Sequence, residues 1–195
     1  MSKEFGANLA ASIRARLLRL AQMSGEDYQR VLGRYGIERF LYRLGHCSHR
    51  DRFVLKGATL FTLWTGQAHR PTKDLDLLGY GSSAIEDVEA IIREICEVKA
   101  PDGIVFDAES VEGTRIKEDD EHDGVRIKFN AHLASARIPI QVDIGFGDAV
   151  YPEPELAASR SSIRWLRRRF PPILASPQSQ RSSMQWLNSI SGTAG

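Results

Sequence analysis

Two acids lie two residues apart inside an apolar stretch of the chain. Asp74 and Asp76 are separated by Leu75, so an extended backbone places both carboxylates on one face and the leucine on the other. Two carboxylates held side by side repel each other unless a cation lies between them. Oxygen ligands of this kind suit Mg²⁺. The pair is therefore a candidate site for a divalent cation.

A third acid, Asp143, lies in a second stretch that alternates between apolar and polar residues. Residues 138–144 read Ile-Pro-Ile-Gln-Val-Asp-Ile, which predicts a strand, and an acid there is costly to bury without a partner. If this strand lies beside residues 74–78, then Asp74, Asp76 and Asp143 converge on one face of a sheet. Such a trio can hold two Mg²⁺ ions about 3.5–4 Å apart and bridge a nucleoside triphosphate (NTP). Asp143 is the candidate base or a ligand of the first ion.

Residues just before the acidic pair offer groups for the phosphates of an NTP. Gly57 has no Cβ and lets a phosphate approach the backbone. A helix expected to begin near Thr59 would aim its free N–H groups at the same place. Thr59 and Thr72 add hydroxyls, and Lys73 adds a cation beside the acids. The chain has no Walker motif, so the prediction depends on the joint occurrence of turn, helix and acids.

Each of these features also has a purely structural explanation. Asp74 can cap a turn after Pro71, and Lys73 can be a solvated charge. Gly57 can serve close packing, and Asp143 can be a surface acid on an edge strand. An Asp-x-Asp pair alone is common in proteins, and only the combination of features favours catalysis.

The pattern of the whole chain predicts an α+β fold, in which a small mixed sheet carries packed helices and follows an N-terminal helical segment. Three helices are expected before the sheet, at residues 8–21, from Ser24 to about Gly36, and at 37–44. Later helices are expected at 59–65 and 82–98, an acidic turn at 118–123, and strands at 53–55, 74–78, 104–106, 111–116, 124–133 and 138–144.

Length and composition limit the class of protein. The 195 residues, 42% of them hydrophobic, suffice for one well-buried domain. We expect a helical segment at 1–50, a core at 51–150 and a poorly ordered tail at 151–195. No apolar run approaches the roughly 18–20 residues of a membrane helix, and the N-terminus lacks the layout of a secretory signal. Cys47 and Cys96 lie far apart without metal-ligand spacing, so we expect reduced thiols in a cytoplasmic protein with no membrane partner.

The segments that carry the acids resemble the AbiEii toxin family, within the nucleotidyltransferase superfamily of DNA polymerase β type. The resemblance is carried by Phe-Val-Leu-Lys-Gly-Ala at 53–58, Arg-Pro-Thr-Lys-Asp-Leu-Asp-Leu-Leu at 70–78 and Asp-Ile-Gly-Phe-Gly-Asp-Ala-Val at 143–150. It implies the fold of that superfamily. By position it implies metal-binding or nucleotide-binding roles for Gly57, Thr72, Lys73, Asp74, Asp76 and Asp143.

The resemblance also implies an activity and partners. Family members transfer a nucleotide from an NTP, with Mg²⁺, and the expected acceptor is an RNA, tRNA first of all. They act as toxins of type IV toxin–antitoxin or abortive-infection systems, and a cognate antitoxin counteracts them. By resemblance, this chain is expected to be such a nucleotidyltransferase.

The C-terminal tail departs from the family pattern from about Tyr151. Residues 157–195 contain six arginines and nine serines but no lysine and no acid, where the family has a nucleotide-contacting lysine and a further aspartate. One hypothesis is that the tail is translated out of frame, which makes the chain a truncated, inactive remnant that only binds an antitoxin or nucleic acid. The alternative is a genuine divergent tail, with a basic arm at 164–169 suited to RNA phosphates. A transferase that acts on a small molecule is a further alternative.

Overall fold

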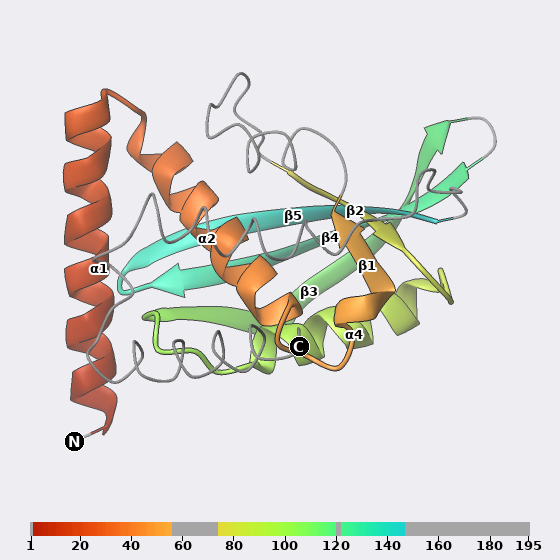
Figure 1. Ribbon diagram of the computed structural model, residues 1–195, viewed down its shortest axis with the longest axis horizontal. Coiled ribbons are helices and arrows are strands. Elements are labelled where there is room, and N and C mark those ends of the chain that lie inside the picture. Colours follow the sequence, from red (N-terminus) through yellow and green to blue (C-terminus); the bar gives the residue numbers. More distant parts are fainter. Residues whose placement is uncertain (1, 56–73, 120–121, 147–195) are drawn as a thin grey trace, which may run out of the picture.

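The computed structural model describes residues 2–55, 74–119 and 122–146 (Figure 1). The elements, in chain order, are α1 (Ser2–Ser24), α2 (Tyr28–Leu44), a short 3₁₀ helix (Arg50–Arg52), β1 (Phe53–Leu55), β2 (Leu75–Gly79), α4 (Ile85–Glu97), β3 (Ile104–Asp119), β4 (His122–Leu133) and β5 (Ala136–Phe146). The strands form one sheet in the order β1-β2-β5-β4-β3. β2 and β5 are parallel, and the other neighbouring pairs are antiparallel. The predicted α+β class, with a mixed sheet and packed helices, is confirmed.

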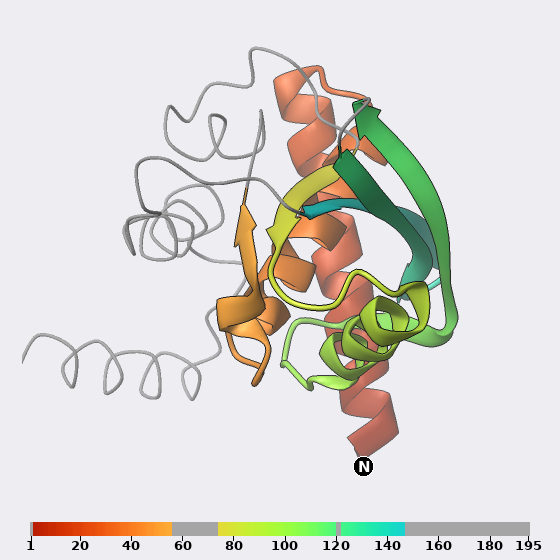
Figure 2. The ribbon, with the colours of Figure 1, turned by 90° about the vertical axis from the view of Figure 1, so that its right-hand side faces the viewer.

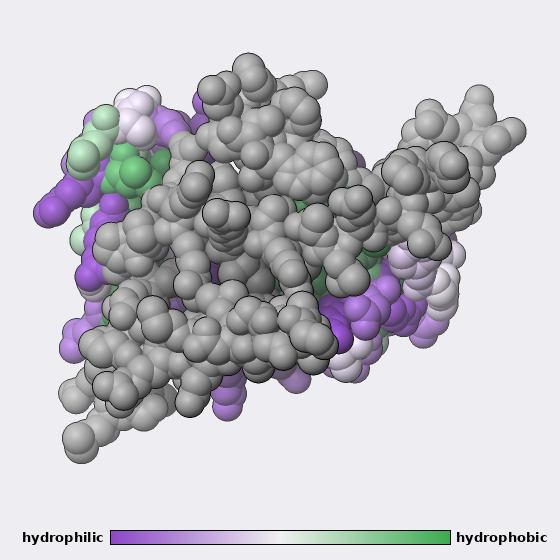
Figure 3. Space-filling view, in the orientation of Figure 1, coloured by the Kyte–Doolittle hydropathy of each residue, from purple (hydrophilic) through white to green (hydrophobic). Residues whose placement is uncertain are grey.

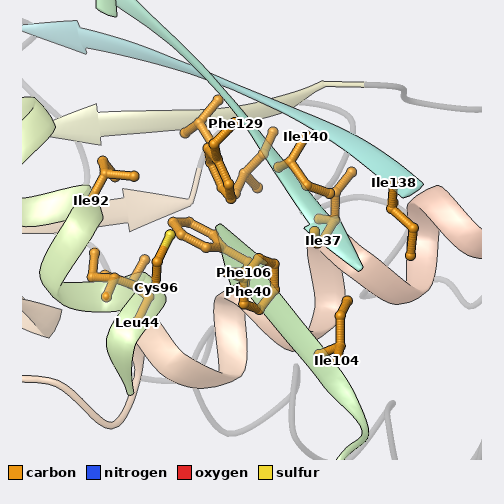
Figure 4. Close-up of a cluster of buried hydrophobic side chains, with 14 of the residues drawn as sticks. Ile37, Phe40, Leu44, Ile92, Cys96, Ile104, Phe106, Phe129, Ile138 and Ile140 are labelled. Atoms are coloured by element: carbon orange, nitrogen blue, oxygen red, sulfur yellow. The ribbon is translucent and has the colours of Figure 1, made fainter. Parts of the chain in front are cut away.

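One hydrophobic core fills the space between the sheet and the helices. Every second residue of β5 from Ile138 to Ile144 is buried, so the residues between them point to the opposite face. Phe40 of α2 packs against Phe129 and Phe106, with ring centroids 5.1 and 5.9 Å apart. Figure 4 shows this cluster, and Figure 2 shows the sheet curving around the helices. The core therefore covers one face of the sheet, and the acids of β2 and β5 belong to the other.

Helix α1 lies at the end of the sheet where β4 turns into β5 (Figure 1). The side chain of Arg14 donates from Nη1 to Oγ of Ser135 in that turn, at 2.8 Å. The buried residues of α1 recur at helical spacing and join the same core as the sheet: Ala10, Ile13, Leu17 and Ala21. The helical segment and the sheet thus share one core, and the boundaries at residues 50 and 150 stay a prediction.

Gly36 does not end a helix as the sequence analysis expects. α2 runs without a break from Tyr28 to Leu44, capped by Asp27, whose Oδ1 accepts a hydrogen bond from the backbone of Arg30 at 3.1 Å. A Cβ on Gly36 would lie 2.7 Å from Cδ1 of Ile140, so the glycine lets α2 approach β5 closely. The predicted boundary between two helices is wrong, because this glycine serves packing inside one helix.

The two strands expected at 104–106 and 111–116 form a single strand, β3, with a bulge. The register against β4 shifts between Asp107 and Glu112. Ser110 holds the bulge, because its hydroxyl donates to the carbonyl of Asp107 at 2.7 Å and accepts from the backbone of Asn130 at 2.9 Å. The expectation of two strands is wrong for this reason: the irregular residues interrupt the ladder without ending the strand.

Other predicted elements agree with the structure within a few residues. The acidic strand expected at 74–78 is β2, which begins at Leu75, and the helix expected at 82–98 is the shorter α4. The strands expected at 124–133 and 138–144 are β4 and β5. The helix expected at 59–65 and the tail from residue 151 lie outside the described residues. No helix in the described part is long and apolar enough to cross a membrane.

A buried ionic cluster ties α2 to the loop before β3. The carboxylate of Asp102, 1% exposed, accepts from Nε of Arg39 at 2.7 Å and from both Nη atoms of Arg43 at 2.8 and 3.1 Å. The hydroxyl of Tyr35 donates to the carbonyl of Asp102 at 2.7 Å. Arg39 and Arg43 are therefore buried and ion-paired rather than facing water or a nucleic acid. Elsewhere, the surface of the described residues visible in Figure 3 is mostly hydrophilic.

Candidate active site

The two acidic stretches lie on neighbouring strands. β2 pairs with β5 in parallel, and the register sets Asp76 directly beside Asp143. Neighbouring strands are about 4.8 Å apart, so the two carboxylates start from adjacent points of the sheet. Leu75 and Val142, their paired neighbours, are fully buried in the core. The condition on which the sequence analysis depends, adjacency of the two strands, is therefore met, and both acids lie on the face away from the core.

The register carries this line of side chains across four of the five strands. Asp143 pairs with Arg126 of β4, and Arg126 pairs with Thr114 of β3. We call Asp76, Asp143, Arg126 and Thr114 the polar row. It lies on the face opposite the core and reads acid, acid, base, hydroxyl across four strands.

Arg126 and Asp143 form a fork-shaped ion pair. Nε of Arg126 donates to Oδ1 of Asp143 at 2.8 Å, and Nη2 donates to Oδ2 at 2.7 Å. Gln141 adds weaker contacts from Nε2 to the same two oxygens, at 3.3 and 3.4 Å. The side chain of Asp143 is 12% exposed and that of Arg126 is 36% exposed. Such two-point pairing fixes the direction of a carboxylate as well as its charge.

Asp74 lies just before β2, and its negative charge also acts on the guanidinium of Arg126. The hydrogen bond to Asp143, together with the negative charges of Asp143 and Asp74, raises the pKa of Arg126 above its ordinary value. Asp76 and Asp143 are thus neighbours on this face, Asp74 lies just before the same strand as Asp76, and the three acids outnumber the single arginine among these four groups.

These residues fit a divalent cation in their chemistry. Asp74, Asp76 and Asp143 are hard oxygen donors, the type that Mg²⁺ prefers. Within the described ranges, however, no three His, Cys, Asp or Glu side chains are gathered as a finished ligand set. Both oxygens of Asp143 instead receive hydrogen bonds from Arg126.

The nucleotide-binding residues expected from the sequence cannot be compared with the structure. Gly57, Thr59, Thr72 and Lys73 lie outside the described residues. Their roles stay predictions.

Sequence reasoning missed the contact that Arg126 makes, although a signal was present. The alternation of β4 places Arg126 and Lys128 away from the core, which identifies them as residues of the outer face. The missing information was the order of the strands, because only the pairing of β4 with β5 brings Arg126 to Asp143.

Comparison with known proteins gives one match. A family model described as "Nucleotidyl transferase AbiEii toxin, Type IV TA system" matches residues 39–178, more than two thirds of the chain. The match begins inside α2 and continues past Tyr151, where the sequence analysis expects the resemblance to end. No curated protein and no solved structure matches the chain.

Proposed function

Since this chain belongs to the AbiEii family of nucleotidyl transferase toxins of type IV toxin–antitoxin systems, we propose that it transfers a nucleotide from an NTP to an RNA, with tRNA as the acceptor. The observation that supports this most is the register of β2 and β5, which sets Asp76 beside Asp143. Carboxylates on adjacent strands can hold the metal ions that such a transfer to a phosphorus centre uses.

The proposed roles follow from the chemistry of the side chains. Asp74, Asp76 and Asp143 would hold Mg²⁺, which would supply positive charge to the triphosphate and make the attacking hydroxyl more acidic. Asp143 either completes this ligand set or accepts the proton of the hydroxyl. The hydroxyl oxygen of the RNA forms a bond to the α-phosphorus, the bond from that phosphorus to the bridging oxygen breaks, and pyrophosphate leaves.

The triphosphate needs groups that the acids do not provide. We propose that Gly57 and the helix expected after it present backbone N–H groups to the phosphates. Thr59 and Thr72 contribute hydroxyls, and Lys73 contributes a positive charge beside the acids. In the cell, the product of this reaction would arrest growth, and a cognate antitoxin would counteract it.

Transfer of label to RNA tests the proposal. The purified chain is incubated with each α-³²P-labelled NTP, Mg²⁺ and total tRNA, next to Asp76→Asn and Asp143→Asn variants. Both substitutions keep the shape of the side chain and remove its charge, so we expect label in tRNA from the parent chain and a loss of at least about a hundredfold in the variants. Asp51→Asn is the matched control, because the side chain of Asp51 is 86% exposed and, among the described residues, makes only a surface contact with Arg50.

A second chain, with residues from 157 onward read in the alternative frame, is assayed in parallel. If the parent chain transfers no label, this comparison separates an inactivating tail from a wrong choice of acceptor. Label from that chain alone would mean that the present tail makes the enzyme inactive. Label from a folded Asp76→Asn variant would refute the proposed role of the acids. Silence from both chains with tRNA, but label in another RNA or in a small molecule, would refute the choice of acceptor.

A further inference from the structure

Arg126 occupies the carboxylate that the proposed reaction needs. We propose that Arg126 is a positioning residue that competes with the divalent cation for Asp143, and that it must release at least one oxygen of Asp143 before the cation binds there. This inference rests on the proposed function, because it requires a cation at Asp76 and Asp143.

Arg126 donates a hydrogen bond to each carboxylate oxygen of Asp143. Its Nε and Nη2 donate to Oδ1 and Oδ2 of Asp143 at 2.8 and 2.7 Å, which are short distances for N–H···O bonds. Gln141 approaches the same oxygens from its own strand at 3.3 and 3.4 Å. A cation that takes an oxygen of Asp143 as a ligand needs the same lone pairs, and a guanidinium and a dication repel each other at that distance.

The ion pair can open, unlike the buried contacts of Arg39 and Arg43 with Asp102. Arg43, which binds Asp102, is 2% exposed and also donates to the carbonyls of Val98 and Ile104, so it cannot leave without stranding buried groups. Arg126 is 36% exposed, and within the described part of the chain its side chain donates only to Asp143. It can therefore turn to water at a smaller cost than Arg43 can.

The charges on this face explain why such a competitor is useful. Asp74, Asp76 and Asp143 would repel one another in the protein without metal, and the positive charge of Arg126 offsets part of that repulsion. When a cation is bound, the same role is filled by the cation, and the arginine is in excess. Arg126 thus stabilises the metal-free fold and weakens the binding of metal.

Direct measurement of Mn²⁺ binding tests this inference without reference to activity. The full chain and an Arg126→Gln variant are titrated with Mn²⁺ alone, and free Mn²⁺ is read by electron paramagnetic resonance. We expect the variant to bind Mn²⁺ about tenfold more tightly, since one charge-assisted two-point contact no longer has to be broken. Lys128→Gln is the matched control: Lys128 is exposed, lies two residues along β4 on the same face, and pairs with Gln141. Loss of its charge alone should change the affinity by less than about twofold.

A second measurement covers the case in which the glutamine variant folds poorly. Melting temperatures are recorded with and without saturating Mn²⁺ for the parent chain, Arg126→Gln and Arg126→Lys. Without metal, both variants should melt lower than the parent, and Mn²⁺ should reduce that difference. Lysine keeps the charge but loses the fork, so its affinity for Mn²⁺ should lie between those of the parent and the glutamine variant.

The outcomes separate this inference from the proposed function. Equal or weaker Mn²⁺ binding by Arg126→Gln would overturn the inference; weaker binding would mean that the arginine prepares Asp143 for the metal. If Asp76→Asn and Asp143→Asn lose Mn²⁺ binding in the same experiment, the proposed site survives and only the role of Arg126 falls. If neither aspartate affects Mn²⁺ binding, the proposed site and the inference both fail.

Discussion

Asp102 should be one of the most important single side chains for the stability of this fold. Its carboxylate is 1% exposed and receives three hydrogen bonds from two guanidinium groups, which are themselves 4% and 2% exposed. The backbone N–H of Ile104 contacts the same carboxylate at 3.4 Å. Asp102→Asn keeps the volume of the side chain but removes its negative charge. Arg39 and Arg43 then lose the carboxylate that compensates them in the interior.

The cost of this substitution can be worked from these contacts. Removal of one partner from a buried ion pair costs about 3–5 kcal/mol, because the remaining charge is left without compensation. The upper part of that range applies here, since one carboxylate serves two arginines. A domain is stable by only about 5–15 kcal/mol in total, so the variant loses a large share of its stability. In a chain of this size the loss corresponds to a melting temperature lower by roughly 10–20 °C.

Urea unfolding of the full chain, followed by far-ultraviolet circular dichroism, measures the effect. The control is Glu94→Gln, which makes the same carboxylate-to-amide change in an exposed glutamate whose carboxylate contacts the ring of His49 at 2.7 Å. We expect less than about 1 kcal/mol there. If Asp102→Asn lowers the free energy of unfolding by less than about 1 kcal/mol, as the control does, the reasoning is refuted. The two arginines would then not depend on Asp102 for compensation of their buried charge.

Two further predictions concern single positions in the core and at its rim. Burial raises the pKa of the Cys96 thiol to about 12 from an ordinary value near 9, so its thiolate forms more readily in the unfolded chain. The contribution of this thiol to the free energy of unfolding is complete below about pH 9 and falls by up to about 1.4 kcal/mol per pH unit between pH 9 and 12. Urea unfolding across that range should show a shallower fall of stability with pH for Cys96→Ala than for the parent chain. Equal slopes for the two proteins would contradict the prediction. Gly103 has φ +69°, and a Cβ there would lie 2.9 Å from the backbone Cα of Ala10 in α1. Gly103→Ala should therefore lower the free energy of unfolding by more than about 2 kcal/mol. Gly33→Ala in α2 should raise it by up to about 1 kcal/mol, because no described atom lies within 4 Å of the added Cβ. If urea unfolding shows shifts of the same sign for both variants, this explanation of the two glycines is wrong.

Much of the fold can be predicted from the sequence because apolar and polar residues alternate regularly along its strands. The alternation along β5 identifies both the face of Asp143 and the face of the core, and it needs no knowledge of the neighbouring strands. Local patterns fail where a residue serves a distant contact. Gly36 looks like a helix stop, yet it exists to admit Ile140, which lies far along the chain.

The same limit applies to the candidate site. The sequence suggests that Asp76 and Asp143 belong together, since an acid in an apolar strand needs a partner. It does not identify that partner as Arg126, because β4 contributes to the site only through its register with β5. The burial of Asp102 is not predicted for a related reason. This acid lies in a Pro-Asp-Gly turn, where an acid normally faces water. Its burial follows from the approach of α2.

The bulge in β3 has a consequence for the behaviour of the protein in a crowded solution. β3 is one of the two outer strands of the sheet and the longest strand described. A long regular edge is a template on which another chain can add a strand and begin to aggregate. The bulge interrupts that template. The carbonyl of Asp107 is engaged by Ser110, and the backbone N–H of Glu109 donates to the carboxylate of Asp107 at 3.2 Å. An incoming strand therefore meets an uneven edge, which protects the sheet from self-association.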